Sequence, residues 1–235
     1  PFGYVFGKKN YYGSKATSQY DYDTQYENRT NKNTYYIPTT LKNVTLLGGT
    51  IFMGCFFNCD TLTVIALPDG ITSIDKYAFY NCTNLLSIKL PNSVNSIGGN
   101  AFYNCISLSN IDIPEKVSIL SEYVFYNCSS LLNVVIPAGV TKIDTSAFEN
   151  CISMSWVILP ESIREIGSKS FIGCDKLKKI FYLGTKKQWQ NISKVLYPTT
   201  PISSSESNRY YYSETQPTDT TYKYWHYVDG VPTAW

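Results

Sequence analysis

The sequence predicts a β-rich, right-handed solenoid of short parallel strands, and the prediction rests on regular spacing. Six of the seven cysteines follow one another at intervals of 23 residues: Cys59, Cys82, Cys105, Cys128, Cys151 and Cys174. Each has a phenylalanine three residues before it and apolar residues three, six and eight residues after it, the last of these being Tyr182 in the final copy. A fixed period of about 20 to 50 residues is typical of solenoids, in which each repeat packs against its neighbours.

Each repeat is expected to contribute one short strand, formed by the L-x-x-I-x-L segment that follows the cysteine. The last two apolar positions of this segment alternate with a period of two, and a proline follows directly in five of the six copies. Because proline cannot donate a hydrogen bond to a β-ladder, it ends the strand.

The rest of each repeat must return the chain to the start of the next strand. A second apolar pair, such as Val94 and Ile97, predicts another inward-facing stretch on the opposite wall. The A-F-x-N-C segment, residues 78–82 in one copy, is too short for a regular helix, so we expect a 3₁₀ or single-turn element there. Neighbouring coils then stack at about 4.8 Å per repeat, with a ladder of phenylalanines and a column of cysteines inside.

The solenoid is predicted to span residues 41–183, with a cap before it. Leu41, Val44 and Leu46 repeat the strand pattern upstream of the first regular copy, but this coil is two residues shorter than the others, which is typical of a terminal repeat. Residues 1–40 are rich in tyrosine and small polar residues, and we expect them to form an irregular or hairpin cap over the open edge of the first coil.

Residues 184–235 predict a C-terminal cap. We expect a short amphipathic helix within 185–194, a loop or linker over 198–221, and a β-hairpin whose turn is Asp229-Gly230. Trp225 and Trp235 are the candidates for packing this hairpin onto the last coil. A flexible tail is the alternative.

The regular cysteines are expected to be buried, reduced thiols. Metal sites need ligands that converge on one point, whereas the 23-residue series places one thiol in each layer. Stacked thiols have Cβ atoms about 4.8 Å apart, beyond the roughly 3.5 to 4.5 Å that a disulfide needs. Cys55 and Cys59 form the one close pair, and whether they bridge stays open.

Composition argues against several classes of function. The net charge of +2 does not suit a general nucleic-acid binder, and no apolar run reaches the roughly 18 to 20 residues of a membrane helix. The single histidine, His226, leaves little room for histidine-based chemistry, and no hydrolase or nucleotide-binding motif is present. We therefore predict no catalytic residue, metal or cofactor. The start at Pro1 favours a mature or excised piece of a longer protein.

The repeat pattern L-P-x-x-V-T-x-I-G-x-x-A-F-x-x-C-x-x-L-x-x-I resembles the 23-residue bacterial leucine-rich repeat of BspA-like and Treponema-type surface proteins. One copy matches it at Leu90, Pro91, Val94, Ile97, Gly98, Ala101, Phe102, Cys105, Leu108 and Ile111. The resemblance covers residues 41–182. It implies a leucine-rich-repeat solenoid in a secreted or cell-surface protein, with adhesion to host proteins or other cells as the usual proposed role.

A binding face is expected on the outward side of the strands, because solenoids present an extended surface there. The C-terminal half of this side gathers large apolar residues, lysines and polar residues. The candidate face consists of Val135, Trp156, Ile158, Phe181, Lys178, Lys179, Asn133 and Asp112. The alternative is that the C-terminal hairpin or the 198–221 loop covers the apolar members.

Three functional hypotheses follow from the sequence. The first is a non-catalytic protein- or glycan-binding module, such as an adhesin, whose partner is a host or bacterial surface protein or glycan. The second is a structural spacer or assembly repeat in a larger surface protein, with no ligand of its own. The third is an enzyme that holds a carbohydrate with its aromatic-rich ends. The first two place the chain outside the cell, secreted or at the surface.

Overall fold

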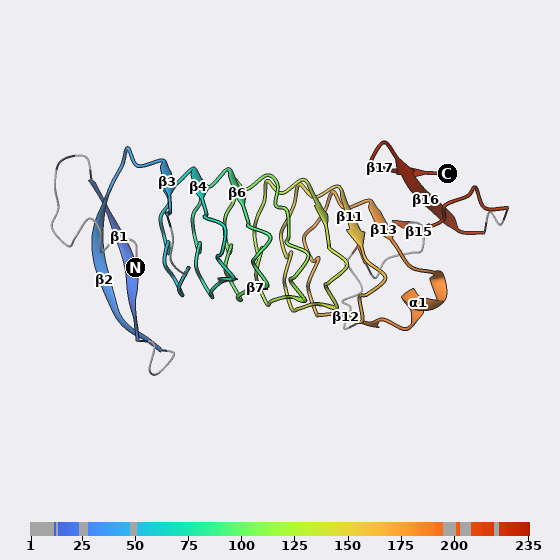
Figure 1. The fold of residues 1–235 in the computed structure, drawn as a ribbon, viewed down its shortest axis with the longest axis horizontal. Coiled ribbons are helices and arrows are strands. Elements are labelled where there is room, and N and C mark those ends of the chain that lie inside the picture. Colours follow the sequence, from blue (N-terminus) through green and yellow to red (C-terminus); the bar gives the residue numbers. More distant parts are fainter. Residues whose placement is uncertain are drawn as a thin grey trace.

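The computed structural model describes residues 12, 14–23, 28–47, 51–194, 201–202, 208–218 and 221–235. Figure 1 shows an elongated stack of coils, with the strand pair β1 (Ser14–Asp23) and β2 (Asn28–Pro38) at one end. Helix α1 (Lys186–Gln190) and the last strands lie at the other end. The predicted solenoid is confirmed.

One wall of the stack, here called the strand wall, is formed by the segments that follow the cysteines. Its strands are β3 (Asn43–Thr45), β4 (Val64–Ala66), β6 (Ser87–Lys89), β9 (Asn133–Val135), β11 (Trp156–Leu159) and β13 (Lys179–Tyr182). Paired strands are parallel, and Ile65 lies opposite Ile88 while Val157 lies opposite Ile180. These β-branched residues point inward and are buried, whereas their neighbours in β4 and β6 point outward, as the period of two requires.

The opposite wall consists of two-residue strands, which in the regular repeats lie at the second apolar pair. They are β5 (Ser73–Ile74), β7 (Ser96–Ile97), β8 (Ile119–Leu120), β10 (Lys142–Ile143), β12 (Glu165–Ile166) and β14 (Ser193–Lys194). All their pairings are parallel, and β14 adds one rung beyond the last regular repeat. This wall therefore continues by one strand after the 23-residue repeat has ended.

The A-F-x-N-C segments form a third side, here called the turn wall, and they are chains of β-turns rather than 3₁₀ helices. The Tyr80 N–H donates to the Tyr77 carbonyl at 3.1 Å, whereas the Asn81 N–H donates to Tyr103 in the next coil at 2.8 Å. Tyr77 and Asn81 have φ of 59° and 58°. A 3₁₀ helix requires negative φ, so these left-handed residues end each turn and free alternate N–H groups to link the coils.

The core behind the turn wall repeats in every coil. The six ladder phenylalanines from Phe56 to Phe171 are fully buried, and successive rings stack with centroids 5.2 to 5.5 Å apart. The six regular cysteines lie beside them and are buried too. Each coil thus buries its apolar edges only against its neighbours, which explains why the pattern must repeat.

The strand wall continues into the C-terminal segment although the repeat has ended. β15 (Arg209–Tyr212) pairs in parallel with β13, and β16 (Lys223–Val228) pairs in parallel with β15. The expectation of a loop or linker over 198–221 is therefore wrong for 209–212. The segment is rich in serine and threonine overall, but it contains a run of three tyrosines at 210–212, and Tyr211 is buried beside Tyr182.

The predicted hairpin at Asp229-Gly230 is confirmed. β16 pairs antiparallel with β17 (Val231–Ala234), and Val228 lies opposite Val231 across the two-residue turn. Asp229 and Gly230 have φ of 50° and 76°, as a type I′ turn requires. Because the Trp235 N–H bonds to the Tyr224 carbonyl at 3.1 Å, the alternate positions 232 and 234 turn their N–H side to the outer edge. Pro232 has no N–H to present there.

Both end segments are attached to the stack. Helix α1 begins after a capping box at Thr185 and Gln188, and its buried Trp189 joins the solenoid core. At the other end, Ile37 of β2 is buried in the same core, and Lys15 of β1 pairs with Asp60. Among the helices in the described ranges, none is both long and apolar enough to span a bilayer.

Candidate binding face on the strand wall

The outward residues of the strand wall form two parallel columns, one on each side of the buried central residue. The first column is Asn43, Val64, Ser87, Asn110, Asn133, Trp156 and Lys179. The second column is Thr45, Ala66, Lys89, Asp112, Val135, Ile158 and Phe181. Unlike the core, these positions differ from coil to coil, so the repeat fixes where they lie and not what they are.

The C-terminal end of the second column is covered. Ile158 and Phe181 are each 1% exposed and pack against Trp225, which is 0% exposed. The rings of Phe181 and Trp225 have centroids 5.1 Å apart, and Trp225 Nε1 donates to the Tyr182 carbonyl at 3.2 Å. The expected exposed face is therefore corrected at Ile158 and Phe181, because the two added parallel strands bring Trp225 over them.

Four of the other predicted residues line one groove. Asp112, Asn133, Val135 and Trp156 surround a cavity of about 330 Å³ that is open to solvent. The remaining lining residues are Asn110, Ile111, Ile113, Glu115 and Pro137. Val135 is 50% exposed, and Trp156 is partly buried because its ring packs edge-on against Phe181. Lys178 and Lys179 are exposed on the coil beyond Trp156.

The groove lies where the solenoid's sheets are interrupted. Residues 110–113 occupy a strand position but form no strand, so the strand wall is divided between β6 and β9, and the opposite wall between β7 and β8. No backbone N–H or C=O of 110–113 is hydrogen-bonded to the backbone of another described residue. The nearby bond from Ser109 N–H to the Leu86 carbonyl is 3.4 Å long, against 2.9 Å one coil earlier.

Local sequence accounts for this interruption, here called the seam. Asn110 and Asp112 stand at the outward strand positions, and both residue types are depleted in strands because their side chains compete for backbone hydrogen bonds. The turn wall stays continuous at the same level, with Phe102 N–H donating to the Val124 carbonyl at 2.9 Å. The solenoid is therefore loosened on its strand side and held together on its turn side.

The groove is rich in hydrogen-bonding groups without a protein partner. The carboxylates of Asp112 and Glu115 form no ion pair or hydrogen bond with another described residue. Asn133 Oδ1 accepts from Ser155 Oγ at 3.0 Å, which leaves the amide NH₂ as a donor. Within the described ranges, no cluster of three or more histidine, cysteine, aspartate or glutamate side chains could hold a metal.

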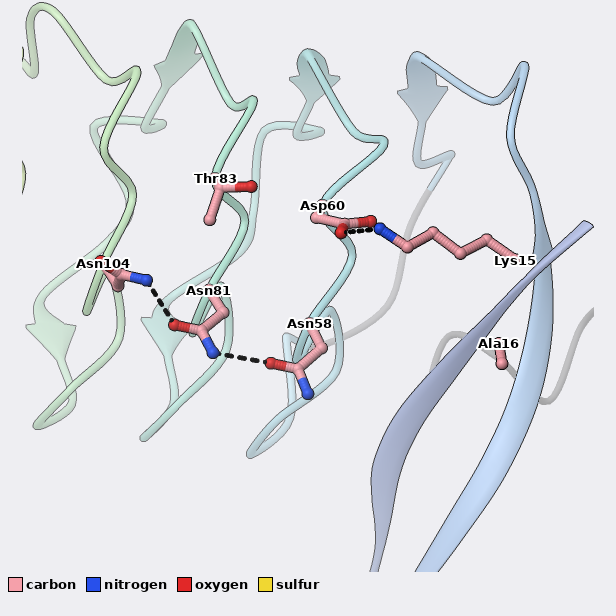
Figure 2. Close-up of a pocket in the computed structure, with 7 residues that line it drawn as sticks. All are labelled: Lys15, Ala16, Asn58, Asp60, Asn81, Thr83 and Asn104. Carbon is pink, nitrogen blue, oxygen red and sulfur yellow. Dashed lines mark hydrogen bonds and ion pairs between the residues drawn. The ribbon is translucent and has the colours of Figure 1, made fainter.

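A second, more polar cavity lies between the N-terminal hairpin and the first coils, as Figure 2 shows. Its lining includes the Lys15–Asp60 ion pair and part of an asparagine ladder. In this ladder Asn81 Nδ2 donates to Asn58 Oδ1 at 2.9 Å, and Asn104 Nδ2 donates to Asn81 Oδ1 at 2.9 Å. These side chains link successive turns, so we assign this cavity a structural role.

The cysteine column offers no reactive group. All seven cysteines are free thiols, so Cys55 and Cys59 are not bridged, and the expected buried thiols are confirmed. Each thiol from Cys82 onward donates to a phenylalanine carbonyl, as Cys82 Sγ does to Phe56 at 3.1 Å. Burial raises the pKa of the Cys82, Cys105 and Cys151 thiols well above its ordinary value, which keeps the thiols protonated and unreactive.

Sequence reasoning missed two polar members of the groove. Asn110 lies in the first outward column, but a search for large apolar residues passes over it. Glu115 follows Pro114, outside the strand segment altogether. The signal that could have found both is the departure of one copy from the β-forming residues of the others, with Asn110 and Asp112 flanking Ile111.

Comparisons with known proteins agree with this geometry. Residues 49–185 match the family model described as BspA type leucine rich repeat region, in six copies. A leucine rich cell surface protein from Faecalibacterium prausnitzii A2-165 is 28% identical, with a TM-score of 0.55 over 77% of this chain and 42% of that one. The T. pallidum leucine rich repeat protein is 26% identical, with a TM-score of 0.55 over 68% of this chain and 87% of that one. No curated protein matches.

Proposed function

Because the chain belongs to the BspA-type leucine-rich repeat family, we propose that it is a non-catalytic binding module of a bacterial cell-surface or secreted protein. The observation that carries this proposal is the groove at the seam, where side chains that the repeat does not specify meet in one open cavity. The F. prausnitzii relative is described as a cell surface protein. This chain covers 42% of the length of that protein, so a surface location and a binding activity of the whole protein are proposals for this chain.

In this proposal the two ends act as caps, which divide the chain into residues 1–40, 41–183 and 184–235. The N-terminal hairpin contributes the buried Ile37, and the C-terminal strands contribute the buried Trp225. His226 stacks on Trp235 with ring centroids 3.7 Å apart, which suits a packing role better than a catalytic one. The middle of the strand wall is left as the open surface.

The test compares binding by a groove variant with binding by a matched variant on another wall. The unaltered chain would be applied to immobilised extracellular-matrix proteins and to a glycan array. Val135→Glu places a charge in the groove and should abolish binding, whereas Asn95→Glu, at an exposed position beside β7, should leave it unchanged. Binding that Val135→Glu does not alter would contradict the proposal. Loss in both variants would indicate a general effect of added negative charge.

A further inference from the structure

We propose that the groove at the seam binds a neutral glycan, with one pyranose ring packed on Trp156 and its hydroxyls held by the surrounding carboxylate and amide groups. This inference rests on the proposed function and names the class of ligand for the same site. It is argued from the rigidity of Trp156, the free hydrogen-bonding groups and the distribution of charge.

Trp156 is a fixed aromatic surface at one end of the groove. Its backbone lies in the middle of a three-strand ladder, opposite Asn133 on one side and Lys179 on the other. Its ring meets Phe181 edge-on, with centroids 6.3 Å apart at 70°. The C–H groups on one face of a pyranose carry partial positive charge and pack well on the negative face of an aromatic ring. Because the indole is already held, little conformational entropy is lost on binding.

The polar groups around Trp156 suit sugar hydroxyls. A carboxylate accepts two hydrogen bonds side by side, so Asp112 and Glu115 can each accept from a pair of adjacent hydroxyls. The amides of Asn110 and Asn133 offer donors, and none of these four groups has its capacity filled by another described side chain. Small-molecule sites commonly combine apolar walls with a few such polar groups.

The charges in and around the groove favour a neutral glycan over anionic ligands and cationic peptides. The two ionisable residues that line the groove, Asp112 and Glu115, are both acidic, so sialylated or sulfated glycans and phosphates would be repelled. A cationic peptide is disfavoured because Lys89 stands one coil before Asp112 in the same column and Lys179 lies next to Trp156. A neutral ligand avoids both conflicts.

The experiment uses the full chain on an array of neutral oligosaccharides, with sialylated and sulfated counterparts and an arginine-rich peptide printed beside them. We expect binding to one or more neutral glycans. Trp156→Ala should weaken it by about tenfold or more, the effect of removing a central aromatic anchor. Asp112→Ala, at an exposed position, should weaken it by about threefold or more. Trp235→Ala removes an exposed indole outside the groove and should leave affinity within about twofold.

Each contrary outcome has a distinct meaning. If Trp156→Ala does not fold, as judged by circular dichroism, Asp112→Ala decides the question. Preference for sialylated or sulfated glycans, or binding of the peptide alone, would overturn the neutral-glycan inference. If Val135→Glu abolishes this binding to an anionic glycan or to the peptide, the proposed function stands although the neutral-glycan inference fails. Binding of neutral glycans that neither Trp156→Ala nor Asp112→Ala weakens would overturn the inference and count against the groove. If no glycan binds while a matrix protein does, the inference alone fails.

Discussion

The turn wall and the strand wall are built from the same six repeats, but their residues recur from coil to coil to different degrees. On the turn wall, phenylalanine, cysteine and a left-handed residue recur in every coil, and hydrogen bonds join each coil to the next. On the strand wall, the outward residues change from coil to coil, and the ladder is broken at 110–113. Stability is therefore concentrated where the repeat is strict, and the candidate site lies where it is relaxed.

The largest expected difference between the two walls appears at alkaline pH. Burial raises the pKa of four turn-wall thiols, those of Cys82, Cys105, Cys128 and Cys151. Above the unfolded pKa of about 8.5, the unfolded chain releases thiol protons that the folded chain retains, so stability is full below that pH and falls as pH rises. Above that pH, each thiol proton that the folded chain alone retains lowers the free energy of unfolding by at most about 1.4 kcal/mol per pH unit.

Urea denaturation at a series of pH values measures this loss. Cys105→Ala is the matched variant, because it removes one of the buried thiols and should make the pH dependence shallower. An unchanged pH dependence in Cys105→Ala would show that other groups, such as the tyrosines, dominate.

Truncating one residue on each wall gives the next largest contrast. Phe102 lies in the middle of the phenylalanine ladder and is fully buried, so Phe102→Ala should lower the free energy of unfolding by about 3 to 5 kcal/mol. Val135 on the strand wall is 50% exposed, and Val135→Ala should change it by about 0.5 kcal/mol or less. Urea denaturation measures both. Equal losses would mean that stability is shared evenly between the walls.

The asparagine ladder sharpens the comparison within the turn wall. Asn104 has φ of 60° and bonds to Asn81 and Asn127 through its side chain. Asn104→Ala should cost about 2 to 3 kcal/mol, from lost hydrogen bonds and a strained backbone, whereas Asn104→Gly should cost about 1 kcal/mol because glycine tolerates this φ. Thermal unfolding measures both variants. The last coil already has Gly173 at the equivalent position, and equal costs would show that φ is unimportant there.

The smallest effect is local and concerns the seam. The amides of 111–113 lack ladder bonds, whereas Val134 lies in a regular strand. Hydrogen exchange followed by mass spectrometry or NMR should therefore show the seam amides exchanging about tenfold faster or more than those of β9 and β11. Equal protection would mean that the strand wall is continuous in solution.

The fold could be predicted from the sequence because its determinants are periodic. The 23-residue interval places Phe102 beside Phe79 and Phe125, and the proline that follows the strand segment in five of the six regular copies marks where it ends. The parallel strand β15 could not be found in this way, since it lies 29 residues after β13 rather than 23, as the pairing of Tyr182 with Tyr211 shows.

The candidate site was predictable only in part. Val135 and Trp156 were found because large apolar residues at outward strand positions are unusual. The burial of Ile158 and Phe181 was predicted only as an alternative, because it depends on Trp225 of the C-terminal hairpin, which is reached through two irregular connections. The local sequence pattern predicts the direction in which a side chain points, whereas its burial depends on residues that are distant in the sequence.

Pro232 has a consequence for how copies of the protein behave together. A stack of parallel strands with a bare final strand could be lengthened by the first strand of another molecule, and so grow into a fibre. β17 opposes this growth, because it runs antiparallel and, of its two outward positions, Ala234 alone retains an N–H. With a single N–H donor along its outer edge, β17 offers a second copy few backbone partners, which disfavours continuation of the sheet from this strand.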